Sequence, residues 1–208
     1  MDQIKHFDKL EKPKEPEFDK DSFIDNMDKY RLENAGSRNF GIFKYQNQII
    51  KIAKKEKSFK KETAQELREV IKSLGLAERV VIPTDIIDLE YNGIPSSLVV
   101  MPIAFGIQAD KLPGDFIDNI PPKHFDQFEK DIRLLSDSGV AIDLTKRSNF
   151  FYSTTKGFVF IDIDVYTKKP TNKFIEKDGK QFYYEFERFP YFPKEYTSAK
   201  DLFLNISK

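Results

Sequence analysis

The most informative part of this sequence is GVAIDLTKRSNFFY at residues 139–152, followed by GFVFIDID at residues 157–164. The first stretch holds an acid, Asp143, and an amide, Asn149, on a polar loop, and the second ends an apolar segment with another acid, Asp162. A hairpin between the two stretches would bring these three side chains to one point. Carboxylate and amide oxygens suit Mg²⁺, which in many proteins also binds phosphate. The stretch therefore predicts a magnesium and phosphate site.

The rest of the second half is predicted to surround this loop with a helix, a hairpin and a tail. Apolar residues at helical spacing predict a helix over about residues 123–138, and Gly139 would end it. The segments NFFY and GFVFID, with the polar turn STTK between them, predict a small hairpin. The tail after Tyr166 is rich in Lys, Phe and Tyr, and we expect it to close with a short helix over about residues 197–206.

The first half is predicted to be rich in β-structure. Its expected segments are, in order, a hairpin at residues 39–55, a helix at about 59–74 ended by Gly75, and two apolar strands at 79–90 and 96–106. The pairs Gln46-Asn47 and Asn92-Gly93 are typical of the turns that join such strands. A loop with several prolines then separates the two halves. The pattern indicates a mixed α+β fold.

Composition limits the classes of function. The 34 Lys and Arg residues equal the 34 Asp and Glu residues in number, so the chain has no basic field and no nucleic-acid partner is expected. The sequence contains no cysteine and only two histidines, which excludes thiolate catalysis and argues against metal sites built from Cys or His. The longest apolar run, from Leu98 to Ile107, contains Pro102 and is far shorter than the about 20 residues that span a bilayer. No membrane span is therefore expected.

The start of the chain is dense in charge. Residues 1–29 have little periodicity and contain two prolines, so we expect a charged N-terminal arm. The first residues, MDQIKHFDKL, have no apolar segment typical of a secretory signal. The expectation is a cytoplasmic protein, or one exported without a classical signal peptide.

The loop with Asp143 and Asn149, followed by Asp162, resembles the catalytic loop and metal-binding strand of the protein-kinase-like fold. That pattern is H-R-D-x-x-x-x-N and then D-F-G. The resemblance implies that Asp143 is the catalytic base, that Asn149 supplies a metal-binding amide, and that Asp162 holds Mg²⁺ against the β- and γ-phosphates of ATP. Ala141-Ile142 stands where His-Arg is usual, and the spacing from Asp143 to Asn149 is one residue longer than in the family.

The first half matches other parts of the same family pattern. Gly36 and Gly41 lie in GSRNFG, where kinase-like folds have a glycine-bearing hairpin over the phosphates. Lys51 in QIIKIAKK matches the strand lysine that binds the α- and β-phosphates, and a glutamate of the next helix would pair with it. Lys54 and Lys55 are expected at the frayed end of that strand.

Helical geometry ranks the three glutamates of the helix that follows Lys51. At about 100° per residue, the centre of the apolar stripe lies about 90° from Glu66, but about 130° to 150° from Glu62 and Glu69. Glu66 should therefore border the buried face, which makes it the predicted partner of Lys51. A lysine beside a carboxylate stays protonated and oriented, as phosphate binding requires.

The stretch LVVMPIAFG at residues 98–106 resembles the strand that leads into the adenine-binding linker between kinase lobes. The residues implied in adenine binding are Met101, Pro102 and Ala104. Pro102 has no N–H but keeps its C=O as an acceptor for the adenine amino group, and Ala104 keeps its N–H as a donor.

These features together imply an α+β, two-lobed protein-kinase-like fold with a small β-rich N-lobe and a truncated C-lobe. The expected parts are the arm at residues 1–29, an N-lobe-like part at 30–106 and a C-lobe-like part at 107–208. The stretch after Asp162 is too short for the activation segment and helical subdomain that bind peptide substrates in full-length kinases. The resemblance is therefore to reduced kinase-like domains, such as some bacterial effector kinases.

The predicted function is phosphoryl transfer from ATP, with Mg²⁺, to a hydroxyl of a protein Ser or Thr or of a small molecule. The alternative is an inactive kinase-fold binding module, a pseudokinase, that engages a protein partner. Each of the residues named above could singly cap a turn or face solvent, and only their order and spacing carry the resemblance.

Overall fold

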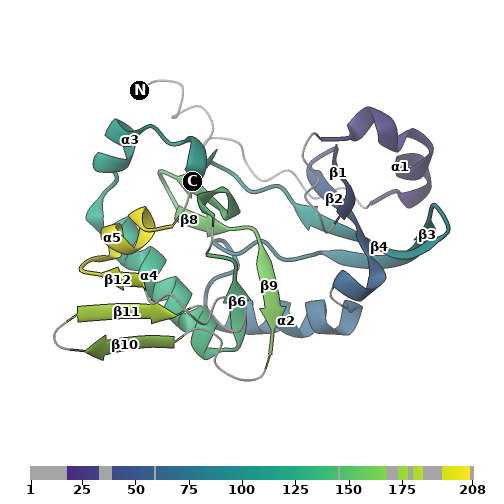
Figure 1. Ribbon diagram of the computed structural model, residues 1–208. Helices are drawn as coiled ribbons and strands as arrows, with labels where there is room; N and C mark the ends of the chain where they lie inside the picture. The colour runs from purple at the N-terminus through teal and green to yellow at the C-terminus, as the bar shows by residue number, and fades with distance from the viewer. Residues whose placement is uncertain are drawn as a thin grey trace. The chain divides into compact units, whose positions relative to one another are not determined.

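Helices and strands occur together in both units into which this chain divides (Figure 1). The computed structural model describes residues 18–32, 39–58, 60–144, 146–167, 173–177, 180–184 and 194–206. The N-terminal unit contains the described residues from 18 to 69 and from 81 to 103, and the C-terminal unit contains those from 70 to 80 and from 104 to 206. The predicted mixed α+β class is confirmed. Among the described residues, no helix combines the length and apolar character needed to cross a membrane.

A four-stranded antiparallel sheet forms the centre of the N-terminal unit, with the strand order β1-β2-β4-β3. Its strands are β1 (Asn39–Tyr45), β2 (Gln48–Lys54), β3 (Asp85–Tyr91) and β4 (Ile94–Pro102). Both predicted strand pairs are confirmed, because β1 pairs with β2 and β3 pairs with β4. The strand β3 begins at Asp85 and not at the predicted residue 79, since Pro83 has no N–H to give to a strand ladder.

Two separate apolar clusters lie on the two faces of this sheet. One contains Phe43 and Leu98 and is completed by Phe23 of the helix α1 (Lys20–Asn26). The other contains Val99 and is completed by Ala64 of the helix α2 (Lys61–Ser73). Neighbouring residues of β4, Leu98 and Val99, belong to different clusters, because successive side chains of a strand point to opposite faces. The sheet is therefore packed on both faces.

Part of the predicted charged arm is structured. Residues 20–30 form α1 and the 3₁₀ turn η2 (Met27–Tyr30), and Asp19 caps α1 by accepting from the Ser22 N–H at 3.0 Å. The Phe23 side chain has no exposed surface, and its ring centre lies 5.3 Å from that of Phe43. Met27 and Tyr30 follow Phe23 at helical spacing and pack on the same apolar cluster, but the charged residues between them hide this pattern in the sequence.

The helix α4 (Pro122–Asp137) is the longest of the C-terminal unit and packs against the predicted hairpin and the last helix. The hairpin is β7 (Phe150–Ser153) with β8 (Gly157–Phe160), and the last helix is α5 (Ala199–Leu204). These three predictions are confirmed. The ring of Phe128 on α4 lies 5.3 Å from Phe150, 4.9 Å from Phe158 and 5.7 Å from Phe203, between centres. Aromatic packing therefore joins α4, the hairpin and α5 in one core.

Several short elements of this unit were not predicted from the sequence. They are β5 (Ile107–Gln108), η4 (Ala109–Lys111), α3 (Gly114–Asp118), β6 (Val140–Ile142), η5 (Arg147–Asn149), β9 (Ile163–Tyr166), β10 (Lys173–Lys177), β11 (Lys180–Tyr184) and β12 (Lys194–Tyr196). The strands pair as β5-β7-β8, β6-β9 and β10-β11-β12. Elements this short hold too few residues for a hydrophobic period to identify them.

Candidate functional site

Two short strands bring together the polar residues of the predicted catalytic loop. Strand β6 pairs antiparallel with β9, Asp143 directly follows β6, and Asp162 directly precedes β9. The N–H of Asp143 donates to the C=O of Asp162 at 3.3 Å. Asn149 joins them, because its Nδ2 donates to the Asp143 C=O at 2.9 Å and its own C=O accepts from the Ile161 N–H at 3.1 Å. The structure thus groups Asp143, Asn149 and Asp162 beside one end of the β6–β9 pair, and all three are half-buried.

The loop over residues 143–149 is held by two further side-chain bonds. Gln108, at the end of β5, donates from Nε2 to the C=O of Ser148 at 2.9 Å. Arg147 donates from Nε to the C=O of Ile206 at 3.0 Å. These bonds attach the loop to two segments far away in the sequence, so its conformation depends on the fold of the whole C-terminal unit.

The side chains of Asp143, Asn149 and Asp162 carry oxygen atoms of the kind that Mg²⁺ prefers. Because the amide nitrogen of Asn149 is bonded to a carbonyl, its oxygen is the atom that it can offer to a cation. Asp143 and Asp162 add carboxylates, and Mg²⁺ prefers such hard oxygen ligands. Within the described parts of the chain, no group of three or more His, Cys, Asp or Glu side chains could hold a metal ion. A Mg²⁺ ion that arrives with a nucleotide needs only one or two carboxylates, since phosphate and water complete its coordination.

The lysine assigned to phosphate binding lies in the N-terminal unit. Lys51 is in the middle of β2, opposite Val99 of β4, and is half-buried. Lys54 is the last residue of β2 and Lys55 begins the following 3₁₀ turn, and both are exposed. Lys55 forms an ion pair with Asp88 at 2.6 Å. The position within the strand therefore distinguishes Lys51 from the two lysines that follow.

Glu66 departs from its predicted place on α2. Its side chain is exposed, as are those of Glu62 and Glu69, so the prediction that it borders the buried face is wrong. The fully buried residues of α2 are Ala64, Leu67 and Ile71. The apolar stripe used for the prediction did not include Ala64. With Ala64 included, the centre of the buried face lies about 40° farther from Glu66. Glu66 is still the glutamate of α2 that lies nearest to that face.

The structure describes only one of the two glycines assigned to the phosphate loop. Gly36 lies outside the described residues. Gly41 lies in β1 next to a shift in the strand register, and a Cβ there would approach the ring of Phe43 to 2.5 Å and Nη1 of Arg31 to 3.1 Å. The packing of the Phe43 ring therefore requires a glycine at position 41, which is a structural reason independent of any phosphate.

The residues assigned to adenine binding follow one another at the end of β4. Met101 is buried and lies opposite Ile49 of β2, and Pro102 is the last residue of the strand. Ala104 is half-buried and belongs to no helix or strand. Farther on, Gly106 has φ +122°, and a Cβ there would collide with the backbone carbonyl of Tyr152, so only glycine fits at this position.

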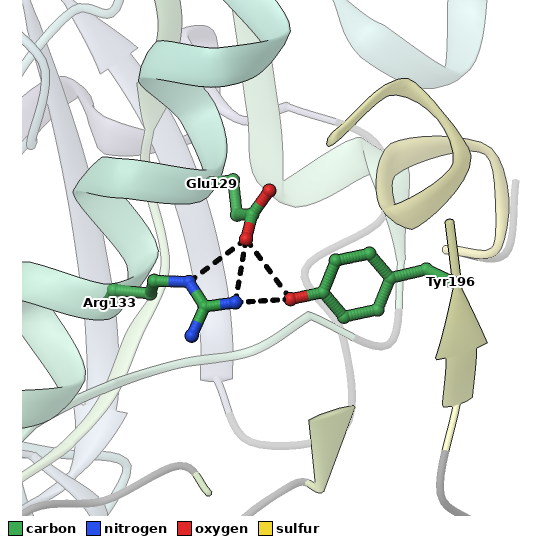
Figure 2. A network of polar contacts seen from close by, with 3 residues as sticks. All are labelled: Glu129, Arg133 and Tyr196. Carbon is green, nitrogen blue, oxygen red and sulfur yellow. Dashed lines mark hydrogen bonds and ion pairs between the residues drawn. The ribbon is translucent and has the colours of Figure 1, made fainter. Parts of the chain in front are cut away.

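A second polar cluster joins α4 to β12 (Figure 2). Arg133 donates to Oε1 of Glu129 from Nε at 2.9 Å and from Nη2 at 2.7 Å, and Nη2 also donates to the Tyr196 hydroxyl at 2.5 Å. The Tyr196 hydroxyl in turn donates to Glu129 at 3.1 Å. Burial, with the nearby Glu129 carboxylate, raises the pKa of Tyr196 to about 12. The phenol therefore keeps the proton that it donates.

Beside this cluster, α4 lines an open groove of about 330 Å³. Its lining residues are Asp126, Glu129, Lys130, Arg133, Leu134 and Asp137. None of them is a residue that the sequence assigned to the phosphate site, and the lining mixes both signs of charge.

Gln108 and Arg147 both hold the loop, but neither was predicted from the sequence. Gln108 follows an apolar run at a position that no motif marks, and Arg147 looks like one more charged residue of a polar loop. Its partner Ile206 is 59 residues away in the sequence. The signal that identifies Arg147 is burial of a guanidinium, with 7% of the residue exposed, and this becomes visible only in the structure.

No family model matches this chain, and a comparison with curated proteins finds no significant match.

Proposed function

We propose that this chain transfers the γ-phosphoryl group of ATP, with Mg²⁺, to a hydroxyl acceptor, on a two-lobed protein-kinase-like fold. The observation that carries the proposal is the hydrogen-bonded grouping of Asp143, Asn149 and Asp162. Two carboxylates and an amide oxygen at one point can bind Mg²⁺ and orient a hydroxyl for in-line attack. The chain order of Lys51, Asp143, Asn149 and Asp162 supports the same function.

Each residue then has a defined role. The acceptor oxygen forms a bond to the γ-phosphorus while the bond to the β-phosphate oxygen breaks, so ADP leaves and Asp143 takes the hydroxyl proton. Asn149 and Asp162 would hold Mg²⁺, which neutralises the charge of the β- and γ-phosphates. Lys51, with Glu66 as its partner, orients the α- and β-phosphates. The protein accelerates the transfer mainly by positioning and by charge neutralisation.

Adenine and the acceptor complete the proposal. The backbone of Met101, Pro102 and Ala104 binds adenine through one C=O and one N–H. The acceptor is a protein Ser or Thr hydroxyl or a small-molecule hydroxyl. Purified protein, incubated with γ-labelled ATP and either a protein mixture or a set of hydroxylated metabolites, distinguishes these two classes by where the label arrives.

Two substitutions test the roles in this site. Asp143→Asn keeps the size of the side chain but removes the base, so transfer of label should fall by about 100-fold or more while Mg·ATP still binds. Asp162→Ala removes a carboxylate ligand and should weaken Mg·ATP binding itself. Nucleotide binding by calorimetry and label transfer, measured on the same preparations, separate the two effects.

The matched control is Asp137→Asn, at the exposed last residue of α4, to which the proposal assigns no role. It should behave as the wild type in both assays. Wild-type turnover in both Asp143→Asn and Asp162→Ala would contradict the assignment.

A specific observation favours the second candidate, a pseudokinase that binds a protein partner. Ala141 and Ile142 stand where the family has His-Arg, and both are buried in β6 with 7% and 5% exposed. Thermal unfolding with ATP distinguishes the candidates. Stabilisation by ATP that requires Mg²⁺, followed by label transfer, favours the enzyme, whereas the absence of any shift favours the binding module.

A further inference from the structure

Arg147 is a buried cation inside the loop that carries the proposed catalytic residues. It begins the 3₁₀ turn η5, which ends at Asn149. Only 7% of the residue is exposed. Its Nε donates to the C=O of Ile206 at 3.0 Å, and its guanidinium carbon lies 5.6 Å from the centre of the Phe203 ring. Both partners belong to the segment of α5, so Arg147 ties this loop to the last helix.

The α5 segment is a firm point of attachment. Leu202, Phe203 and Ile206 are buried, with at most 1% exposed. The ring of Phe203 lies 4.8 Å from that of Phe158 and 5.6 Å from that of Phe125, between centres. Its position is thus fixed by the same aromatic core that holds α4 and the β7–β8 hairpin. A bond to this segment restrains the loop more than a bond to a surface residue would.

The backbone of η5 transmits this restraint to Asn149. The N–H of Phe150 donates to the C=O of Arg147, and the N–H of Asn149 donates to the C=O of Lys146 at 3.2 Å. Asn149 in turn holds the C=O of Asp143 through its side-chain amide. A shift of Arg147 would therefore change the distance between the proposed metal ligand and the proposed base.

Burial of the Arg147 guanidinium costs desolvation free energy. An exposed side chain at this position would avoid that cost. The bond to Ile206, which follows the C-terminal end of α5, and the Phe203 ring offset part of this cost, since cations are favoured at helix C-termini and over aromatic faces. The guanidinium also reaches both partners from a single rigid plane, which a lysine ammonium does not.

We propose that Arg147 is a positioning residue, and that through it the C-terminal helix α5 sets the spacing of Asp143 and Asn149 for phosphoryl transfer. This inference rests on the proposed function. Under this inference the rate of phosphoryl transfer also depends on α5, although α5 contributes no metal ligand and no base.

Two variants and one control test the inference. Arg147→Met keeps the length and the apolar stem but loses the hydrogen bond, and Arg147→Lys keeps the charge and one donor. The control is Lys200→Met, which removes a cation from α5 that is paired with Asp118 at 2.8 Å on the surface. Three quantities are measured on each protein: amide hydrogen exchange, label transfer with its kcat and its KM for ATP, and thermal unfolding.

Exchange is expected to rise selectively in Arg147→Met at the amides of Asp143, Asn149 and Ile161, while the amides of Ile132 and Leu135 in α4 keep wild-type protection. The kcat should fall by about 10- to 100-fold with little change in the KM for ATP, because geometry and not nucleotide affinity is disturbed. Arg147→Lys should lie between Arg147→Met and the wild type, and Lys200→Met should match the wild type.

Unchanged exchange of the loop amides in Arg147→Met would overturn the inference. An equal rise in the loop and in α4 would also overturn it, since that is loss of global stability. If the wild type transfers label and Arg147→Met keeps its kcat, the inference fails while the proposed function stands. If the wild type transfers no label, the proposed function fails, and the exchange pattern alone decides whether α5 positions this loop.

Discussion

His124 links the stability of the C-terminal unit to pH. Its Nδ1 lies 2.9 Å from the Tyr152 hydroxyl, which can donate to a neutral imidazole. Burial, with a smaller contribution from Lys123, lowers the pKa of His124 below its usual value of 6.5. The unfolded chain therefore binds more protons than the folded chain between these two pKa values. The contribution to stability is complete above about pH 6.5 and is lost as the pH falls through the pKa of the folded state.

Replacing His124 should reduce this dependence. We expect His124→Gln to make the free energy of unfolding change less between about pH 7.5 and pH 5 than in the wild type, because one titrating group is removed. Urea unfolding at a series of pH values measures the effect. His6→Gln, which alters the other histidine of the chain, is the control for changes that any histidine would cause. Equal pH dependence in His124→Gln and the wild type would contradict the role of His124.

The sequence predicted that Asp143, Asn149 and Asp162 lie together, but it did not predict the residues that hold their loop. Asp143, Asn149 and Asp162 were predicted to meet because a polar loop and a hairpin lie between them, and hydrogen bonds join them in the structure. Arg147 was not predicted, since its partner lies on a helix far along the chain. Asp131 is a similar case: it is 1% exposed, Arg79 donates two hydrogen bonds to it, and no periodicity in the sequence indicates such a pair.

At the level of elements, the sequence predicted those with a clear period or turn signal. The hairpins β1–β2 and β7–β8 and the helices α2 and α4 carry such patterns. The strand β9 was missed because its pairing with β6 joins two strands that share no local signal. The sheet β10-β11-β12 was missed because its strands lie in a tail whose Lys, Phe and Tyr residues do not alternate regularly.

Among the described residues, the Tyr196 side chain links strand β12 to α4 through hydrogen bonds. Tyr196 is 2% exposed and exchanges hydrogen bonds with Glu129 and Arg133. We expect Tyr196→Phe to lower the free energy of unfolding by about 1–3 kcal/mol, because it leaves two charged groups without their buried partner. Thermal or urea unfolding measures this loss.

The control is Tyr91→Phe in the N-terminal unit, where the tyrosine hydroxyl accepts from Arg31 at 3.4 Å in an exposed contact. Its effect should be within about 0.5 kcal/mol, as for most surface substitutions. A loss in Tyr196→Phe no greater than that in Tyr91→Phe would mean that the cluster does not stabilise the unit.

For the whole molecule, the proposed function assigns Lys51 and Asp162 to the phosphates of one nucleotide. Lys51 belongs to the N-terminal unit, and Asp143, Asn149 and Asp162 belong to the C-terminal unit. The roles assigned to Lys51 and Asp162 concern the phosphates of the same ATP. Under the proposed function, substitutions at these two positions should therefore not be independent.

A double-mutant cycle on Mg·ATP affinity, measured by calorimetry with Lys51→Met, Asp162→Ala and the double variant, tests this claim most directly. Lys54→Met, at the exposed end of β2, is the control and should bind as the wild type does. We predict that each single substitution weakens binding by about 10-fold or more, and that the double variant departs from additivity by about 0.5–3 kcal/mol. Strictly additive effects, or wild-type affinity in both single variants, would contradict the account.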